Sequence, residues 1–465
     1  MIIEQHLKLS NNTESNTINR LVIIGGVVIF LASLALRLWD IDRFAYPVFD
    51  EVHFPKFAEG YLLNNPPNDG HPPLGKYVIA LGILLFGHNE TGYRIASMTI
   101  GACIPVLGMG LIYRLTSKAW LAIWTGLLIF ADGLFLVESR YGLLNGFLVA
   151  FGLASQIFLL AGLQRQSRDR WLMLSLSGIM MGFCAGVKWN GAGFWLMTWL
   201  LIMITAMYQR FFPKLAAKLG ILGKLGNLNW YEYLLSLILL PATAYILQWV
   251  PHVLMIVKVF APTARGWEWL KSMGKHLIIS NQYIYQWNTS ASSVGSPEHP
   301  IHPYCSSAAS WALSMRPVGY YFHVDGNIFL DVHALGNPIL WWLSTAAMVA
   351  ISYWGVRRSQ AELIYISVGY AANYFPWFLV KRCLFIYHYM SPAIFSFMGL
   401  AWLICYFYQQ PQIWFKNVAV IAIACIFSAQ IFFMPIWLGL PISSQSFYMR
   451  MWFMPNSPIR GFNWI

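Results

Sequence analysis

Charged residues are scarce in this sequence. Only 10% of its 465 residues are Asp, Glu, Lys or Arg, against about 25% in ordinary globular proteins. A chain of this length built from soluble domains would carry far more charge on its surface, so soluble domains are excluded. Hydrophobic residues make up 58% of the chain and the mean hydropathy is +0.55. These values are typical of an integral membrane protein.

The sequence also lacks a basic run that would bind nucleic acid. Its 30 Lys and Arg outnumber its 18 Asp and Glu and give a net charge of +12, but these charges are spread over loops rather than gathered in one domain. The six cysteines have no metal-ligand spacing. We expect no nucleic acid partner, no metal site and no cofactor, while a metal requirement stays open. Whether Cys305 pairs with Cys383 also stays open.

Long apolar runs are abundant. A membrane helix needs about 20 such residues, and the sequence predicts an all-α integral membrane protein with about eleven spans. The predicted spans are 21–38, 92–113, 119–137, 141–163, 172–187, 191–208, 232–257, 337–355, 361–380, 384–407 and 417–436.

The positions of Lys and Arg predict the orientation, because short cytoplasmic loops carry an excess of these residues. With the N-terminus in the cytoplasm, every inner loop is basic. The inner basic residues are then Arg114, Lys118, Arg165, Arg168, Arg170, Arg210, Lys214, Lys218, Lys224, Arg357, Arg358 and Lys416.

This arrangement of the spans across the membrane predicts five segments and a long first outer loop, 39–91. That loop contains a helical pattern and an apolar run too short to span, so we expect helices lying on the outer face. The five segments are a cytoplasmic tail (1–20), a transmembrane bundle with the catalytic outer loop (21–257), a small extracytoplasmic cap (258–336), the C-terminal transmembrane helices (337–436) and an extracytoplasmic tail (437–465).

Unusual polar residues gather at the outer ends of the predicted spans. Ionisable groups at membrane depth are costly, so they tend to line a functional cavity. At helix ends there is an alternative, because Lys and Arg also reach the lipid headgroups. The clusters are Asp50 and Glu51; His71 and Lys76; Glu138 and Arg140; Lys188; His302, Tyr304 and Arg316; and Lys381, Arg382, Tyr387 and His388.

Several cations beside a carboxylate match the chemistry of a lipid-linked phosphate. Lys76, Arg140 and Arg382 would neutralise a phosphate diester and make it a good leaving group. Asp50 would accept the proton of an attacking hydroxyl as a general base. A one-step displacement at a sugar carbon inverts its configuration and needs no second carboxylate as nucleophile.

Six motifs occur in order from about Phe49 to Pro392: FDEVHFPKFA, HPPLGK, ESRYGLLN, VKWNG, GNPILWW and RCLFIYHYMSP. With them the sequence resembles the protein O-mannosyltransferases, the dolichyl-phosphate-mannose protein mannosyltransferases of the glycosyltransferase C superfamily. The resemblance implies a membrane bundle of that type with outer-face helices. It also implies an enzyme that transfers mannose from a polyprenyl phosphate carrier to Ser or Thr of secreted or membrane proteins, at the outer face of the plasma membrane.

The resemblance assigns roles to individual residues. Asp50 is expected to be the catalytic base, and Glu51 to support the acceptor or the loop. The expected donor-phosphate contacts are Lys76, Arg140, His71 and Arg382. Further candidate substrate contacts are Lys188, Tyr304, Arg316, Tyr387 and His388.

Two departures from the family pattern matter. The RYxLLD pattern of the family reads RYGLLN here, so Asn145 replaces an expected carboxylate and its role stays open. The segment 258–336 has no room for the MIR repeats of eukaryotic members, which favours a bacterial type with undecaprenyl or a similar carrier. The sequence does not indicate the oligomeric state.

Two alternatives remain at this point. One is a relative that transfers a sugar from polyprenyl phosphate to a lipid or glycan acceptor, since the same base and cations would serve it. The other is a non-catalytic lipid-phosphate transporter. A transporter is expected to place ionisable residues through the membrane depth, whereas here the middle of the bilayer is nearly uncharged, with Asp132 as the nearest exception.

Overall fold

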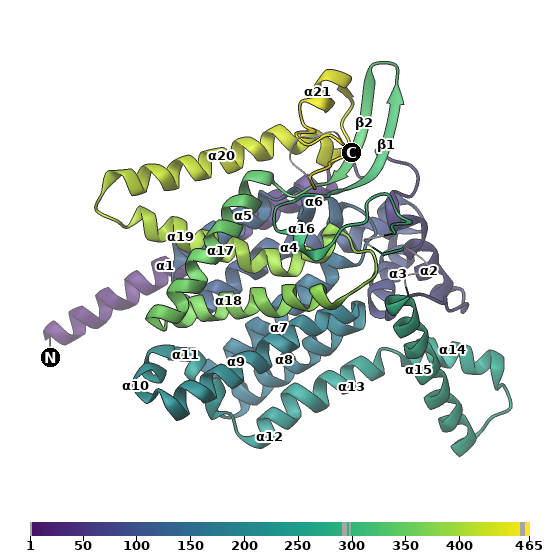
Figure 1. Cartoon of the computed structure of the whole chain (residues 1–465). Helices are drawn as coiled ribbons and strands as arrows, with labels where there is room; N and C mark the ends of the chain where they lie inside the picture. The colour runs from purple at the N-terminus through teal and green to yellow at the C-terminus, as the bar shows by residue number, and fades with distance from the viewer. Residues whose placement is uncertain (1, 291–294, 297–298, 456–460) are drawn as a thin grey trace.

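The long apolar runs fold into long helices that lie side by side in one bundle (Figure 1). The computed structural model describes residues 2–290, 295–296, 299–455 and 461–465. The helices of the first half are α1 (Ile2–Leu38), α2 (Phe54–Leu62), α3 (Leu74–Phe86), α4 (Glu90–Thr116), α5 (Ala119–Phe130), α6 (Gly133–Arg140), α7 (Asn145–Gln164), α8 (Ser167–Val187) and α9 (Ala192–Phe211).

The second half adds further helices and a small sheet. Its helices are α10 (Pro213–Ala216), α11 (Gly220–Gly223), α12 (Trp230–Tyr233), α13 (Leu240–Leu247), α14 (Val250–Phe260), α15 (Gly266–Thr289), α16 (Ala308–Trp311), α17 (Pro338–Arg358), α18 (Ala361–Tyr374), α19 (Met390–Tyr408), α20 (Ile413–Leu438) and α21 (Ser444–Tyr448). The strands are β1 (Val318–Asp325), β2 (Ile328–Ala334) and β3 (Ile442–Ser443). Short 3₁₀ turns lie at Phe49–Val52, Trp189–Gly191, Ala217–Leu219, Leu225–Asn227, Phe375–Leu379 and Ile386–Tyr389, and a π-helical stretch lies at Leu234–Leu239.

The predicted all-α membrane class is confirmed, with a somewhat smaller number of full spans. Within the described part of the chain, nine helices are long and apolar enough to cross a membrane, and the pair α5 and α6, bent by 61°, makes a tenth. The predicted span 361–380 corresponds to α18, which has only 14 residues, although α18 packs against α9, α17 and α19. Hydropathy alone does not show where a helix stops within an apolar run.

The centre of the bundle is formed by α7 and α19, whose side chains are mostly buried. Helices in a membrane associate by close packing rather than by the hydrophobic effect. Two glycines allow neighbouring helices to pack closely on α7 and α19: a Cβ on Gly152 of α7 would lie 2.2 Å from the ring of Phe194 of α9, and one on Gly369 of α18 would lie 2.3 Å from the ring of Phe395 of α19. The rings therefore occupy the space that any larger residue would need.

Short elements cover one end of the bundle, where Figure 1 shows α2, α3, α15 and the hairpin of β1 and β2, away from the N-terminus. The hairpin is antiparallel, running from the pair Val318 and Ala334 to the pair Asp325 and Ile328, and β3 pairs with the other edge of β2. Helices in the first loop and a small irregular cap are thus present. The sequence did not predict the hairpin or the 24-residue helix α15.

Cys305 and Cys383 form a disulfide that ties the cap to the segment before α19. The two residues are 78 positions apart in the sequence. Beside the bridge, Ser306 and Leu384 exchange backbone hydrogen bonds. The pairing that the sequence left open therefore joins two segments at the end of the bundle that carries the candidate site.

Candidate functional site

Asp50 lies in the 3₁₀ turn Phe49–Val52 and lines a cavity of about 310 Å³. The preceding residue, Phe49, has a φ of 54°, a left-handed conformation that persists only where the surrounding structure fixes it. Its ring stacks on Tyr320 of β1, with the ring centroids 4.0 Å apart. Burial raises the pKa of Asp50, and the ammonium of Lys188 acts against this shift. The site thus presents a carboxylate of increased basicity to a cavity.

Glu51 is fully engaged in holding the fold together. Its carboxylate forms a forked ion pair with Arg94 of α4 at 2.9 and 2.8 Å. It also accepts hydrogen bonds from the backbone N–H groups of Val48 and Gly142. These contacts tie the turn that carries Asp50 to α4 and to the start of the segment before α7, and Glu51 is not in the lining of the Asp50 cavity.

Lys76 is paired with a carboxylate of the preceding loop. Its Nζ lies 2.5 Å from Oδ2 of Asp69 and donates to the backbone oxygen of His71 at 2.8 Å. It lines a cavity of about 550 Å³ beside α14 and α15, which adjoins the Asp50 cavity because both are lined by Asp69 and His71, although Lys76 itself is not in the lining of the Asp50 cavity. A buried ammonium with its own carboxylate is a structural pair. The structure thus places Lys76 where it fixes the loop that carries His71.

Arg140 also lies outside the Asp50 cavity. Its guanidinium donates to the backbone oxygens of Leu36 at 2.9 Å, Trp39 at 3.1 Å and Asp40 at 3.4 Å. The C-terminal carbonyl groups of a helix have no partners within that helix. Arg140 therefore caps the end of α1, and the phosphate contact expected of it stays a prediction.

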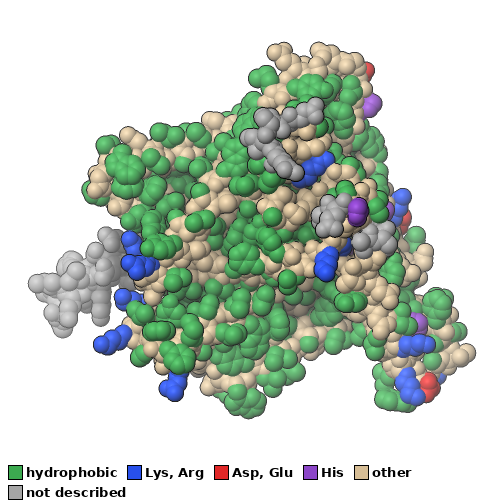
Figure 2. Space-filling model, viewed as in Figure 1, with side chains coloured by type: hydrophobic (Ala, Val, Ile, Leu, Met, Phe, Trp, Pro, Cys, Tyr) green, Lys and Arg blue, Asp and Glu red, His purple; other side chains and the backbone are tan. Residues whose placement is uncertain are grey.

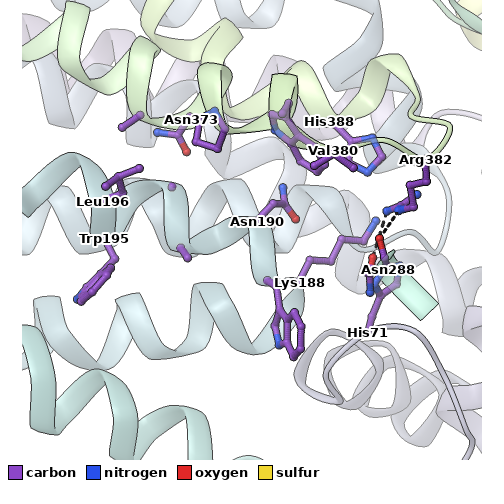
Figure 3. Close-up of a pocket in the computed structure, with 16 residues that line it drawn as sticks. His71, Lys188, Asn190, Trp195, Leu196, Asn288, Asn373, Val380, Arg382 and His388 are labelled. Atoms are coloured by element: carbon purple, nitrogen blue, oxygen red, sulfur yellow. Dashed lines mark hydrogen bonds between the residues drawn. The ribbon is translucent and has the colours of Figure 1, made fainter. Parts of the chain in front are cut away.

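Lys188 and Arg382 point toward each other at the junction of two cavities (Figure 3). One is the Asp50 cavity, and the other has a volume of about 450 Å³. Asn288 of α15 holds the guanidinium of Arg382 through its backbone oxygen and Oδ1, both at 3.1 Å. Both cavities share a set of residues, which are His71, Lys188, Asn288, Arg382 and His388.

The second cavity is mainly apolar. Its lining comes from the start of α9 and from α18 with the turn that follows it (Figure 3). The apolar lining residues include Trp189, Trp195, Leu196, Pro376, Trp377 and Val380. An apolar groove that ends at two cations is suited to a lipid with an anionic headgroup.

His71 is a neutral group at this junction. Burial and the nearby ammonium of Lys188 lower the pKa of its imidazole to about 3. A neutral imidazole has one N–H donor and one acceptor nitrogen. His71 therefore lies in the site as a neutral hydrogen-bonding group and carries no positive charge.

The remaining predicted residues divide into two groups. Tyr387 and His388 line the Asp50 cavity, and Nζ of Lys188 lies 5.4 Å from the ring centroid of Tyr387. Tyr304 and Arg316 lie apart from it: Arg316 stacks over the ring of Tyr304 and donates to the backbone oxygens of 303, 463 and 465. These two residues hold the cap to the C-terminal tail.

Two residues of the site were missed in the sequence. Asn288 lies near the end of α15 in a run of polar and aromatic residues without a recognisable motif. Asp69 stands in NNPPNDGHPP seven positions before Lys76, and an acid so close to a buried lysine was a usable signal. Within the described residues, no group of three or more His, Cys, Asp or Glu side chains is arranged to hold a metal.

The helical bundle is similar to those of solved membrane glycosyltransferases of the glycosyltransferase C fold. The Pmt1-Pmt2 complex of Saccharomyces cerevisiae, bound to the sugar donor, matches with a TM-score of 0.75 and 14% identity over 95% of this chain and 93% of that chain. ArnT of Cupriavidus metallidurans matches with a TM-score of 0.54 and 15% identity over 89% of this chain and 65% of that chain. These likenesses show the fold.

The family follows from the sequence comparisons. The model described as dolichyl-phosphate-mannose-protein mannosyltransferase matches residues 27–257, and that of the C-terminal four-TMM region of protein-O-mannosyltransferase matches 275–358 and 351–456. A polyprenol-phosphate-mannose protein mannosyltransferase of Mycobacterium tuberculosis is 23% identical over 92% of this chain and 91% of that protein. One of Corynebacterium glutamicum is 25% identical over 88% of each. The chain therefore belongs to the protein O-mannosyltransferase family and is a membrane glycosyltransferase.

Proposed function

We propose that this enzyme transfers mannose from a polyprenyl-phosphate-mannose donor to Ser or Thr hydroxyls of proteins. The observation that carries the proposal is the junction of the two cavities, with Lys188 and Arg382 between an apolar groove and the carboxylate of Asp50. In this proposal the apolar groove binds the isoprenoid chain and the junction binds its phosphate. The Asp50 cavity holds the sugar and the acceptor hydroxyl. The names of the mycobacterial and corynebacterial relatives support this donor and a protein acceptor.

Lys188 and Arg382 are the proposed phosphate contacts. Lys188 offers a compact positive charge and Arg382 a planar fork that matches phosphate oxygens. Because His71 is neutral, it would add a hydrogen bond without charge. In this assignment the two cations at the junction replace Lys76 and Arg140, whose positive groups are occupied by Asp69 and by backbone carbonyls.

The proposed reaction is a single inverting displacement with Asp50 as general base. The acceptor hydroxyl oxygen forms a bond to C1 of mannose while the bond from C1 to the phosphate oxygen breaks. The hydroxyl proton passes to the carboxylate of Asp50, and the electron pair of the broken bond stays on the phosphate. Lys188 and Arg382 stabilise the charge that develops on this leaving group.

We further propose that the site faces the outside of the plasma membrane, with the N-terminus in the cytoplasm. Disulfides persist in oxidising compartments, and the bridge between Cys305 and Cys383 lies at the end that carries the site. Figure 2 shows Lys and Arg side chains at the other end of the bundle, where α1 begins. The last turns of α9 and α17 are basic, as expected for helix ends at the cytoplasmic face.

A transfer assay tests this function. The purified protein in liposomes receives a polyprenyl-phosphate-mannose donor and a Ser/Thr-containing peptide, and mass spectrometry follows the peptide. We expect a gain of one hexose on the peptide. Transfer to added lipids or glycans but not to the peptide would contradict the protein acceptor and favour the related lipid-linked-sugar transferase.

A further inference from the structure

A chain of hydrogen bonds connects β1 with the lysine at the junction. Glu138, in the last turn of α6, is buried and accepts a hydrogen bond from the hydroxyl of Tyr320. Its other oxygen accepts one from Nδ2 of Asn145 at 2.8 Å. Oδ1 of Asn145 accepts one from Nζ of Lys188 at 2.9 Å. Neither Glu138 nor Asn145 is in the lining of the two cavities.

The direction of these hydrogen bonds depends on the charge of Glu138. A carboxylate only accepts, whereas the amide of Asn145 has a donor side and an acceptor side. Because Glu138 engages the donor side of this amide, the amide oxygen faces Lys188. A glutamine in place of the carboxylate has both a donor and an acceptor side, so it would no longer fix this orientation of the amide.

Glu138 also supplies a negative charge that Asn145 lacks. Lys188 is buried, and a buried ammonium without a nearby carboxylate is strongly destabilising. Three carboxylates oppose the effect of burial on the pKa of Lys188, those of Glu138, Asp50 and Asp69. Without Glu138, Asp50 would remain as the nearer counter-charge, and an ion pair with it would draw Lys188 from the phosphate position and lower the basicity of Asp50.

We propose that Glu138 and Asn145 act as a positioning pair for donor binding: Glu138 orients the amide of Asn145, and Asn145 holds the ammonium of Lys188 at the junction of the two cavities. This inference rests on the proposed function and extends it to two residues that touch no substrate. It also gives a role to Asn145, which the motif left unexplained.

Exchange of the two side chains tests the pair. Glu138→Gln removes the charge and is expected to lower kcat/KM for the donor about tenfold or more, because Lys188 loses this negative charge and the glutamine amide no longer fixes the orientation of Asn145. The double variant Glu138→Gln/Asn145→Asp moves the carboxylate to the neighbouring position. The glutamine amide can then donate to the aspartate, and Tyr320 can donate to the glutamine oxygen, so each hydrogen bond has a partner. We expect the double variant to recover to within about threefold of the wild type.

Asp132→Asn is the matched control. Asp132 is another buried carboxylate close to Glu138 in sequence, but its partners are the neutral N–H groups of Phe135, Asn337 and Trp341. This variant is expected to lower the thermal unfolding midpoint while leaving the donor KM and the peptide KM unchanged. Glu138→Gln, in contrast, is expected to change the donor KM and kcat and to leave the peptide KM unchanged.

Binding of polyprenyl phosphate, which needs no turnover, is measured on the same variants. We expect weaker binding by Glu138→Gln and recovery in the double variant. Unchanged donor kinetics and lipid-phosphate binding in Glu138→Gln would overturn the inference, as would a double variant no better than the single one. A wild-type protein that binds polyprenyl phosphate but transfers no mannose would instead contradict the proposed function, and the lipid-phosphate affinities would still decide the positioning role.

Discussion

At the residue scale, the account depends most on Asp50. Asp50→Asn keeps the size of the side chain and removes its ability to take a proton, so we expect turnover to fall about a hundredfold or more. Donor binding is expected to stay within about threefold, because the phosphate contacts are on Lys188 and Arg382. Single-turnover transfer and lipid-phosphate binding separate the two effects. A variant with normal turnover would remove Asp50 from the mechanism.

The raised pKa of Asp50 predicts the acid side of the pH profile. A general base works only when deprotonated, so turnover falls as the pH decreases through its pKa. Because burial raises this pKa, the fall is expected at a higher pH than for an ordinary Asp, whose pKa is about 3.9. His71, with a pKa of about 3, stays neutral across this range. A kcat that is constant down to about pH 4 would contradict the assignment.

The pair of Asp69 and Lys76 has a structural prediction of its own. Asp69→Asn leaves the buried ammonium without its counter-charge, which is expected to cost about 3–5 kcal/mol of unfolding free energy. Burial raises the pKa of Asp69, but the ammonium of Lys76 outweighs this effect and the pKa lies below its usual value. The ion pair therefore stabilises the fold fully at pH values above the pKa that Asp69 has in the unfolded chain. This stabilisation is lost as the pH falls through the lower pKa that Asp69 has in the folded protein.

Thermal unfolding as a function of pH measures this effect. The double variant Asp69→Asn/Lys76→Met is expected to lose less stability than the sum of the two single variants, because each single variant leaves one charge unpaired. Strictly additive losses would show that the two side chains do not act as a pair.

The sequence identified where polar residues gather but not which partner each one takes. Asp50, Lys188 and Arg382 lie at the end of the bundle where the pattern of outer helix ends predicted a site. Lys76 and Arg140 belong to the same pattern, yet one meets Asp69 and the other meets the carbonyls of α1. A residue's place at a helix end follows from periodicity, whereas its side-chain partner depends on loops whose path the sequence pattern does not determine.

At the scale of elements, the apolar runs predicted the helices well and their interruptions poorly. The bend between α5 and α6 comes at Asp132, which caps α6 by accepting from the N–H of Phe135 at 3.1 Å. An Asp in an apolar run is a usual N-cap, so this break had a signal. The hairpin of β1 and β2 had none, because its strands lie in a segment of mixed polar and aromatic residues.

The disulfide is the element-scale feature with the clearest prediction. Cys383 is adjacent to Arg382, so the bridge to Cys305 holds the segment that carries this proposed phosphate contact. Cys305→Ser/Cys383→Ser is expected to reduce stability by about 2–4 kcal/mol and to raise the donor KM more than the peptide KM. Thermal unfolding and steady-state kinetics check this. Equal changes in both KM values would indicate a general loss of structure.

At the scale of the whole molecule, orientation is the open prediction. Asp325→Cys places a thiol in the hairpin and Arg168→Cys places one in the first turn of α8, both at exposed positions. We expect a membrane-impermeant maleimide to label the first variant in intact cells and the second only after permeabilisation. The wild type serves as the blank for its four free cysteines, Cys103, Cys184, Cys405 and Cys425. The reverse pattern would place the site in the cytoplasm.

The central claim is that one junction brings a lipid phosphate, two cations and the base together. A structure determined with bound polyprenyl phosphate tests it most directly. The account predicts phosphate density within hydrogen-bonding distance of Nζ of Lys188 and the guanidinium of Arg382, with the isoprenoid chain along α9 and α18 and the free face of the phosphate toward Asp50. Phosphate density beside Lys76 or Arg140, remote from Asp50, would contradict it.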